Sequence, residues 1–138
     1  MSAPLPTPAP IVTVETKPFW DATASGRMLL PRCTECATVI WYPRSWCPAC
    51  LSREIEWIEA SGRGTVYSHS TVRRGAMPPF NEALPYVLAY VELEEGPRML
   101  TNIVTDDPDS VSVGQAVELV FQSYGEGALP RFRPVEGD

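Results

Sequence analysis

The sequence CTEC at residues 33–36, followed by ten residues and then by CPAC at residues 47–50, contains every cysteine of the chain. Each Cys-x-x-Cys turn directs two sulfur atoms to one point, so two such turns can surround a metal ion tetrahedrally. Zn²⁺ binds four thiolates at roughly 2.3 Å, and a site with four protein ligands is structural because it leaves no position for a substrate. The spacing therefore predicts a structural zinc site with the ligands Cys33, Cys36, Cys47 and Cys50.

Other chemistry for these cysteines is less compatible with the sequence. A redox-active Cys-x-x-Cys normally stands alone beside a strand–helix unit, and here there are two with no such unit. Disulfides need an oxidising compartment, which nothing near the N-terminus indicates. An iron centre with four sulfur ligands stays open, because the spacing does not separate iron from zinc.

The composition limits the possible partners. The chain has 138 residues and a formal net charge of −6, which fits one domain or two very small ones with an acidic surface. Such a surface repels nucleic-acid phosphates and offers no basic patch to an anionic membrane. Ten of the eleven basic residues are arginine, which suits specific contacts with anions.

The N-terminal sequence predicts neither a membrane anchor nor a secretion signal. No apolar run approaches ~18 residues, and residues 1–14 lack a basic region followed by an apolar one. We therefore expect a cytoplasmic protein whose thiols stay reduced. Residues 1–15 are rich in proline and alanine, which predicts a disordered tail.

Residues 16–61 are predicted to form a short helix and the zinc ribbon. Thr16 can cap a helix over residues 16–25, and its Phe19 and Trp20 must dock on this chain or on a partner. We expect strands at residues 27–32, 39–43 and 51–60. The aromatic side chains between the cysteine pairs are expected to shield the metal or, alternatively, to face a partner; these are Trp41, Tyr42 and Trp46.

Residues 62–138 have the pattern of a small β-barrel that follows a turn at residues 62–64. Five strands are predicted, at residues 65–74, 86–93, 98–105, 116–124 and 129–133. Val66 and Val72 are expected to share one face of the first strand. A long loop spans residues 75–85, and one helical turn fits within residues 106–112.

The order of these elements resembles a family of zinc-ribbon/OB-fold proteins associated with acyl-CoA enzymes, long described as a domain of unknown function. The resemblance covers about residues 16–134 and implies a mainly β fold. It consists of a short helix, a rubredoxin-like zinc ribbon and a five-stranded OB-fold barrel. The matching residues are Phe19, Trp20, Cys33, Cys36, Pro43, Arg44, Cys47, Pro48, Cys50, Gly64, Pro85, Tyr86, Val91, Leu93, Gly96, Gly114, Arg131 and Phe132.

The resemblance implies an accessory subunit in a hetero-oligomer with a thiolase-like enzyme. Family members accompany thiolases and lipid-transfer-protein-type aldolases, where they are thought to shape the CoA or acyl channel while the partner carries the nucleophile. The chain departs from the family at Ala37, where a glycine normally follows the second cysteine. A Cβ in a left-handed position costs about 1 kcal/mol, so we expect a slightly reshaped turn there.

An acidic protein must meet a CoA ester through arginines that are held in place, since long-range attraction is absent. The expected CoA contacts are Arg73, Arg74, Arg131 and Arg133, at a site shared with the partner. Strand alternation places Arg131 and Arg133 on one face and separates Arg73 from Arg74. The apolar loop at residues 75–85 is expected to contact the partner or the acyl group, or else to fold back on the barrel.

Two other functions are considered from the residues alone. An OB barrel can bind single-stranded nucleic acid on aromatic side chains, here Tyr67, Tyr86, Tyr90 and Phe121, although the acidic charge argues against it. An independent enzyme would need His69, the one histidine, with Glu92 or the Asp106–Asp107 pair as carboxylates. No nucleophile–base pair is visible in the sequence, since all four cysteines are assigned to the metal and His69 is alone.

Overall fold

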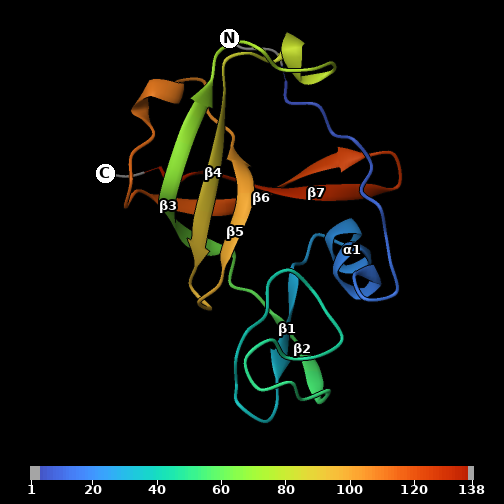
Figure 1. The fold of residues 1–138 in the computed structure, drawn as a ribbon. Coiled ribbons are helices and arrows are strands. Elements are labelled where there is room, and N and C mark those ends of the chain that lie inside the picture. The colour runs from blue at the N-terminus through green and yellow to red at the C-terminus, as the bar shows by residue number, and fades with distance from the viewer. Residues whose placement is uncertain (1–3, 137–138) are drawn as a thin grey trace.

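The computed structural model describes residues 4–136, and its regular structure is mostly β-strand (Figure 1). Its elements are α1 (Lys17–Ala24), β1 (Leu29–Cys33), β2 (Ile55–Glu59), β3 (Arg63–Val72), η1 (Phe80–Glu82), β4 (Tyr86–Leu93), β5 (Arg98–Ile103), η2 (Pro108–Ser110), β6 (Ala116–Tyr124) and β7 (Gly127–Pro134), where η marks a 3-10 turn. The predicted mainly β fold is confirmed, and η2 is the helical turn expected within residues 106–112.

The ribbon is a two-stranded antiparallel sheet in which β1 pairs with β2, from Leu29 opposite Glu59 to Cys33 opposite Ile55. The predicted strand at residues 39–43 is wrong. Only Val39 forms a bridge, with Arg32, before the chain leaves the sheet. Pro43 contributes to this early end, because proline has no amide hydrogen to donate to a ladder.

The barrel is closed, with the strand order β3-β4-β5-β7-β6. Antiparallel ladders join all neighbours except β5 and β7, which run parallel and share the single pair Ile103–Phe132. The barrel agrees with the predicted five-stranded OB fold. We call the thinly paired junction of β5 and β7 the seam.

A β-bulge in β3 changes which residues face the core. The pairing with β4 shifts between Val66, opposite Val91, and Ser68, opposite Tyr90. Because one extra residue reverses the alternation of side chains, Val72 lies on the opposite face from the buried Val66. The expectation that these two valines share a face is therefore wrong. The strand also begins at Arg63, within the segment predicted to be a turn.

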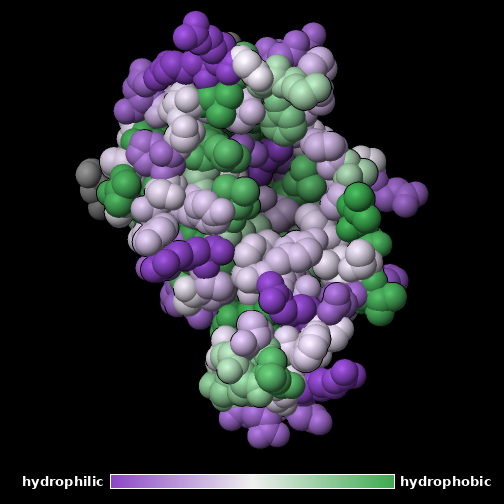
Figure 2. Space-filling view, viewed as in Figure 1, coloured by the Kyte–Doolittle hydropathy of each residue, from purple (hydrophilic) through white to green (hydrophobic). Residues whose placement is uncertain are grey.

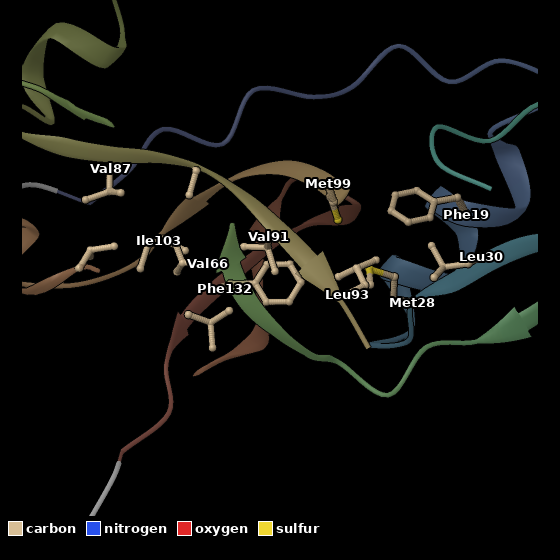
Figure 3. Close-up of a cluster of buried hydrophobic side chains, with 13 residues drawn as sticks. Phe19, Met28, Leu30, Val66, Val87, Val91, Leu93, Met99, Ile103 and Phe132 are labelled. Carbon is tan, nitrogen blue, oxygen red and sulfur yellow. The ribbon is translucent and has the colours of Figure 1, made fainter. Parts of the chain in front are cut away.

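One apolar core runs from the ribbon into the barrel (Figure 3). Phe19 of α1 and Leu30 of β1 lie at one end of this core, Met99 and Leu93 lie next to them, and Phe132 lies inside the barrel. Phe19 is fully buried within this chain. Of the two docking sites expected for the helix, its own chain or a partner, the first is therefore confirmed for Phe19. Burial of an aromatic side chain is worth several kcal/mol, which makes ribbon and barrel one packing unit.

Residues 4–15 run along the outside of the barrel to α1 (Figure 1) and contain no helix or strand. They make specific contacts, because the carbonyl of Pro6 accepts a hydrogen bond from Arg131. Residues 1–3 of the predicted tail lie outside the described part. Thr16 precedes α1 without capping it through its side chain, since its Oγ1 accepts instead from the amide of Thr13 at 2.9 Å. The described helices are too short to cross a membrane.

Candidate functional site

The four cysteines come together at the end of the ribbon. Their Sγ atoms all lie within 4.8 Å of one another, with Cys33–Cys50 at 3.6 Å and Cys36–Cys47 at 3.5 Å. A tetrahedron of sulfur atoms around zinc has edges of about 3.8 Å, and none of the four cysteines is in a disulfide. The four residues therefore fit a structural zinc ion, with Cys33 and Cys47 buried and the other two at the surface.

The two Cys-x-x-Cys turns have the same hydrogen-bond pattern. The amide of Ala37 donates to the carbonyl of Cys33 at 2.9 Å, and that of Leu51 donates to Cys47 at 2.8 Å. Ala37 and Leu51 both have φ +66°, in the left-handed region. The expected reshaping at Ala37 is therefore wrong, because the turn keeps the glycine-like conformation and accepts the cost of a Cβ. The same feature at Leu51 has no signal in the sequence.

The pKa values of the two exposed cysteines, Cys36 and Cys50, are shifted in opposite directions. Hydrogen bonds from Thr38 lower the pKa of Cys36 to about 6. Cys50 also has a backbone hydrogen bond, from Ser52, that lowers its pKa, but the neighbouring thiols and burial together raise it to about 12. Metal ligands must be thiolates, and a zinc ion among the four sulfur atoms would favour that form.

The apolar cover of this centre is aliphatic. Ile40 and Ile55 pack against Cys33 and Cys47. The expectation that the aromatic residues between the cysteine pairs shield the metal is wrong for Trp41, whose ring lies 5.1 Å from Phe19 at the barrel side of the ribbon. Trp46 is 49% exposed and lies beneath Arg53.

Trp41 and Tyr42 line a cavity of about 350 Å³ between the ribbon and the barrel seam. One wall comes from α1 and the ribbon, and the other from β5 and β7. The cavity exists because β5 and β7 separate beyond their single pair, where an antiparallel ladder would have closed the gap. Its lining is Phe19, Trp20, Trp41, Tyr42, Met99, Leu100, Thr101, Asn102, Leu129, Pro130 and Arg131.

Arg131 is the charged residue of this cavity, and it is only 4% exposed. It donates from Nε to Asn102 Oδ1 at 3.2 Å, from Nη1 to Gln122 Oε1 at 2.6 Å and from Nη2 to the Pro6 carbonyl at 2.7 Å. All three acceptors are neutral. Burial lowers the pKa of Arg131, yet an arginine stays charged under ordinary conditions. The seam thus holds a buried cation without a carboxylate among the described residues.

The other predicted CoA-contacting arginines do not join Arg131. Arg73 lies just after β3 and is paired with Asp109, and Arg133 donates to Glu118 at 3.3 Å on the barrel surface. Arg74 is exposed next to Arg73, and no ion pair of the described residues includes it. The sequence therefore placed Arg131 correctly on β7 but gave no sign that Asn102 and Gln122 would enclose it.

The residues of the alternative functions are dispersed. His69 is exposed on β3, while Glu92 is paired with Arg98 at 3.1 Å. Tyr67 and Tyr90 are about half exposed on the outer barrel face, and Phe121 is part of the packing around the core. No catalytic His–carboxylate pair forms among the described residues, and the Tyr67 ring is already covered by the Arg98 guanidinium, 3.8 Å from the ring centroid.

Known proteins share this combination of ribbon and barrel. Residues 20–56 match the family described as "ChsH2, rubredoxin-like zinc ribbon domain", and residues 57–122 match "ChsH2, C-terminal OB-fold domain". The chain belongs to this ChsH2/DUF35 family. A DUF35 domain-containing scaffold protein of Methanocaldococcus jannaschii is 40% identical over 113 residues, which cover 76% of this chain and 79% of that protein.

Other proteins similar to this chain are named as parts of enzymes. A probable enoyl-CoA hydratase alpha subunit of Thermomonospora curvata is 36% identical over 92% of this chain, which spans only 40% of that protein's length. Subunit BbsA of the benzoylsuccinyl-CoA thiolase of Geobacter metallireducens is 33% identical over 65% of this chain and 58% of BbsA. In the solved Ltp2–ChsH2(DUF35) aldolase, a chain with a TM-score of 0.82 and 35% identity aligns over 91% of this chain and 98% of its own length.

Proposed function

We propose that this chain is an accessory subunit of a hetero-oligomeric enzyme that acts on acyl-CoA esters, and that its partner is a thiolase-like or aldolase subunit. The observation that carries the proposal is the likeness to a chain of the Ltp2–ChsH2(DUF35) aldolase, which extends over nearly the whole of both chains. The similar thiolase subunit BbsA supports the same class of partner.

The chemistry of the described residues agrees with a supporting role. The metal centre has four protein sulfur ligands, so a zinc ion there stabilises the ribbon and leaves no position for a substrate. The four cysteines are therefore committed to structure, and His69 has no carboxylate partner among the described residues. The reacting groups would belong to the partner, and the proposed location is the cytoplasm, where thiols stay reduced and can bind zinc.

A shared CoA-ester site is the finer part of the proposal. Arg73 and Arg133 already neutralise carboxylates, so they are less available to a CoA phosphate. Arg131 has neutral partners only, and Arg74 is exposed at the start of the loop at residues 75–85. In that loop Met77 is 79% exposed while Ala83 is buried against the barrel. We propose that Met77 faces the partner and that Arg74 and Arg131 face the ester.

Co-expression with a thiolase-like or aldolase candidate tests the proposal. A tag on this chain should retain the untagged partner, and size-exclusion chromatography with light scattering should give a hetero-oligomer. The complex should turn over a CoA ester faster than the partner alone. A partner that is fully active without this chain and never co-elutes with it would contradict the accessory role.

Arginine variants of the active complex test the shared site. Arg74→Gln and Arg131→Gln should raise KM for the CoA ester by about tenfold each, the loss expected for one charge-assisted hydrogen bond. Arg27→Gln is the matched control, since Arg27 is an exposed arginine paired with Glu59 on the ribbon. An unchanged KM in both test variants, with zinc still bound, would place the CoA ester outside this chain.

A further inference from the structure

We propose that the seam between β5 and β7 is a binding site for an organic oxyanion with an apolar body, and that residues 5–7 of the chain's own N-terminal segment close it. The inference uses Arg131, which is also a proposed CoA-ester contact, and to that extent rests on the proposed function. It concerns the chain without any partner, so its test is separate.

The first argument is the charge at the seam. Arg131 is 4% exposed and has only amide and carbonyl oxygens as acceptors among the described residues. Burial of a charge is costly unless an opposite charge accompanies it. The orientation of Asn102 is fixed, because its Nδ2 donates to the Val87 carbonyl at 3.0 Å while its Oδ1 receives Arg131. The guanidinium is thus held in place by neutral groups and keeps two N–H groups without a described acceptor.

The second argument is the apolar wall of the same cavity. Trp20 belongs to the cavity wall, and its buried Nε1 has no hydrogen-bond partner among the described residues. A buried donor without a partner costs about 1–3 kcal/mol, so most proteins avoid one. Around Trp20 the wall is aromatic and aliphatic, with Phe19, Trp41 and Leu129 among its residues. A ligand whose apolar body packs against this wall and whose negatively charged end reaches the guanidinium would fit the cavity.

The third argument is the nature of the cover. The Pro6 carbonyl lies 2.7 Å from Arg131 Nη2, where an oxygen of an anion would bind. Leu5 holds this segment on the barrel beside Gln122, in a second cavity of about 330 Å³. Figure 2 shows the barrel face hollowed beside the segment that leads to α1. Prolines at 4, 6, 8 and 10 have no amide hydrogen, so the segment mainly offers acceptors, as an anion does.

These features make the cover displaceable. Hydrogen bonds between a guanidinium and an ionised oxygen are roughly twice as strong as those to a neutral carbonyl. Residues 4–15 contribute no helix or strand that would have to unfold when they move. An oxyanion therefore competes with Pro6 on favourable terms, and the N-terminal segment lowers the affinity of the seam by the cost of its own release.

The test measures octanoate binding to the zinc-loaded full-length chain by calorimetry at low salt. A double variant, Leu5→Gly with Pro6→Gly, weakens the cover while keeping the whole chain. It should bind octanoate about tenfold tighter than the unchanged protein does. This gain equals ~1.4 kcal/mol of binding free energy that is no longer used to displace the cover. The matched control is Pro8→Gly with Ala9→Gly, which adds the same flexibility at two exposed positions and should bind as the unchanged protein does.

Two further substitutions in the double variant separate the site from general apolar binding. Arg131→Gln should abolish the gain. Trp20→Phe makes the apolar wall smaller and should weaken octanoate binding about fivefold. It should not lower the melting temperature, because it also removes a buried donor that is unsatisfied in the free chain. Octan-1-ol, which has the apolar body without the charge, should bind at least tenfold more weakly.

Three results would overturn the inference. The first is equal octanoate affinity in the double variant and its control, which would mean that residues 5–7 cover nothing. The second is octan-1-ol binding as tight as that of octanoate, which would reduce the seam to an apolar pocket. The third is the absence of octanoate binding in every variant. None of these results bears on assembly with a partner, so the proposed function would stand or fall separately.

Discussion

The ribbon and the barrel are stabilised by different forces although they share one core. Around the cysteines the ribbon buries little more than Ile40 and the two inner cysteines, with Ile55 packed beside them. The barrel buries valines, methionine and Phe132 across five strands. A cluster as small as that of the ribbon cannot offset the conformational entropy of its chain, so the ribbon depends on its metal. The ribbon is thus stabilised mainly by metal binding, and the barrel mainly by the burial of apolar side chains.

Removal of the metal should give the largest difference between the two regions. The protein should contain about one zinc per chain and be colourless. A strong chelator should unfold residues 29–59, because structural zinc contributes on the order of 10 kcal/mol of folding free energy. Hydrogen exchange with mass spectrometry should then show full loss of protection in β1 and β2, with residual protection in β4 and β6.

Cysteine substitutions provide the genetic counterpart of the chelator. Cys33→Ser or Cys50→Ser should give insoluble protein, since either change leaves three ligands. A red or brown preparation without zinc would show that the four cysteines bind iron. Equal exchange in ribbon and barrel with and without chelator would contradict the difference between the two regions.

Truncation of the barrel core should have the next largest effect. Phe132→Ala removes a fully buried ring and should lower the free energy of unfolding by about 3–5 kcal/mol while the zinc content is unchanged. Denaturant unfolding followed by circular dichroism measures the loss. The neighbouring Arg133→Ala on the outer face is the control and should cost less than about 1 kcal/mol. Loss of zinc in Phe132→Ala would show that the metal centre depends on the barrel.

The two cysteine turns should respond to glycine with a gain. Ala37→Gly and Leu51→Gly each relieve a left-handed side chain at φ +66°, and each should stabilise the zinc-bound protein by about 1 kcal/mol. Thermal unfolding measures the gain. Ala49→Gly, at a position without positive φ, should instead cost about 0.5–1 kcal/mol. A loss of stability in both test variants would mean that side-chain contacts outweigh the strain.

The smallest effect should come from an ion pair on the surface of the barrel. The Arg63 guanidinium and the Ser61 hydroxyl lower the pKa of Glu94. A lowered pKa in the folded state adds stability above the ordinary carboxyl pKa of about 4.3, and this stability is lost as the pH falls through the folded value. Arg63→Gln should therefore flatten slightly the decline of stability measured between about pH 5 and 3. An identical acid profile would show that the pair contributes nothing.

The sequence predicts most of the architecture because its signals are local. Cysteine spacing identifies the ribbon, and alternation with glycine turns identifies the barrel strands, including the hairpin from β6 to β7. The errors arise where longer-range geometry decides. The bulge after Val66 depends on pairing with β4. The short bridge at Val39 depends on which backbone groups of β1 are free to pair with it.

The candidate sites divide in the same way. The metal ligands follow from spacing alone, whereas the surroundings of Arg131 combine residues from three separated segments. Pro6 and Asn102 lie far from Arg131 in the sequence, so no periodicity relates them. The four arginines proposed as CoA contacts looked equivalent in the sequence. Their partners distinguish them, since two neutralise carboxylates and one is buried.

The direct passage from β2 to β3 has a mechanical consequence. Ala60 donates its amide to Met28 at 2.8 Å, the amide of Leu119 reaches the carbonyl of Gly62 at 2.8 Å, and Ser61 is bonded to Glu95. Each of residues 60–62 is thus hydrogen-bonded to the ribbon or to the barrel, which leaves no free residue to act as a hinge between the two. A body without a hinge transmits torque. In the proposed complex, a partner that binds the ribbon would also set the orientation of the barrel, and relative motion would occur at the surface between the two subunits.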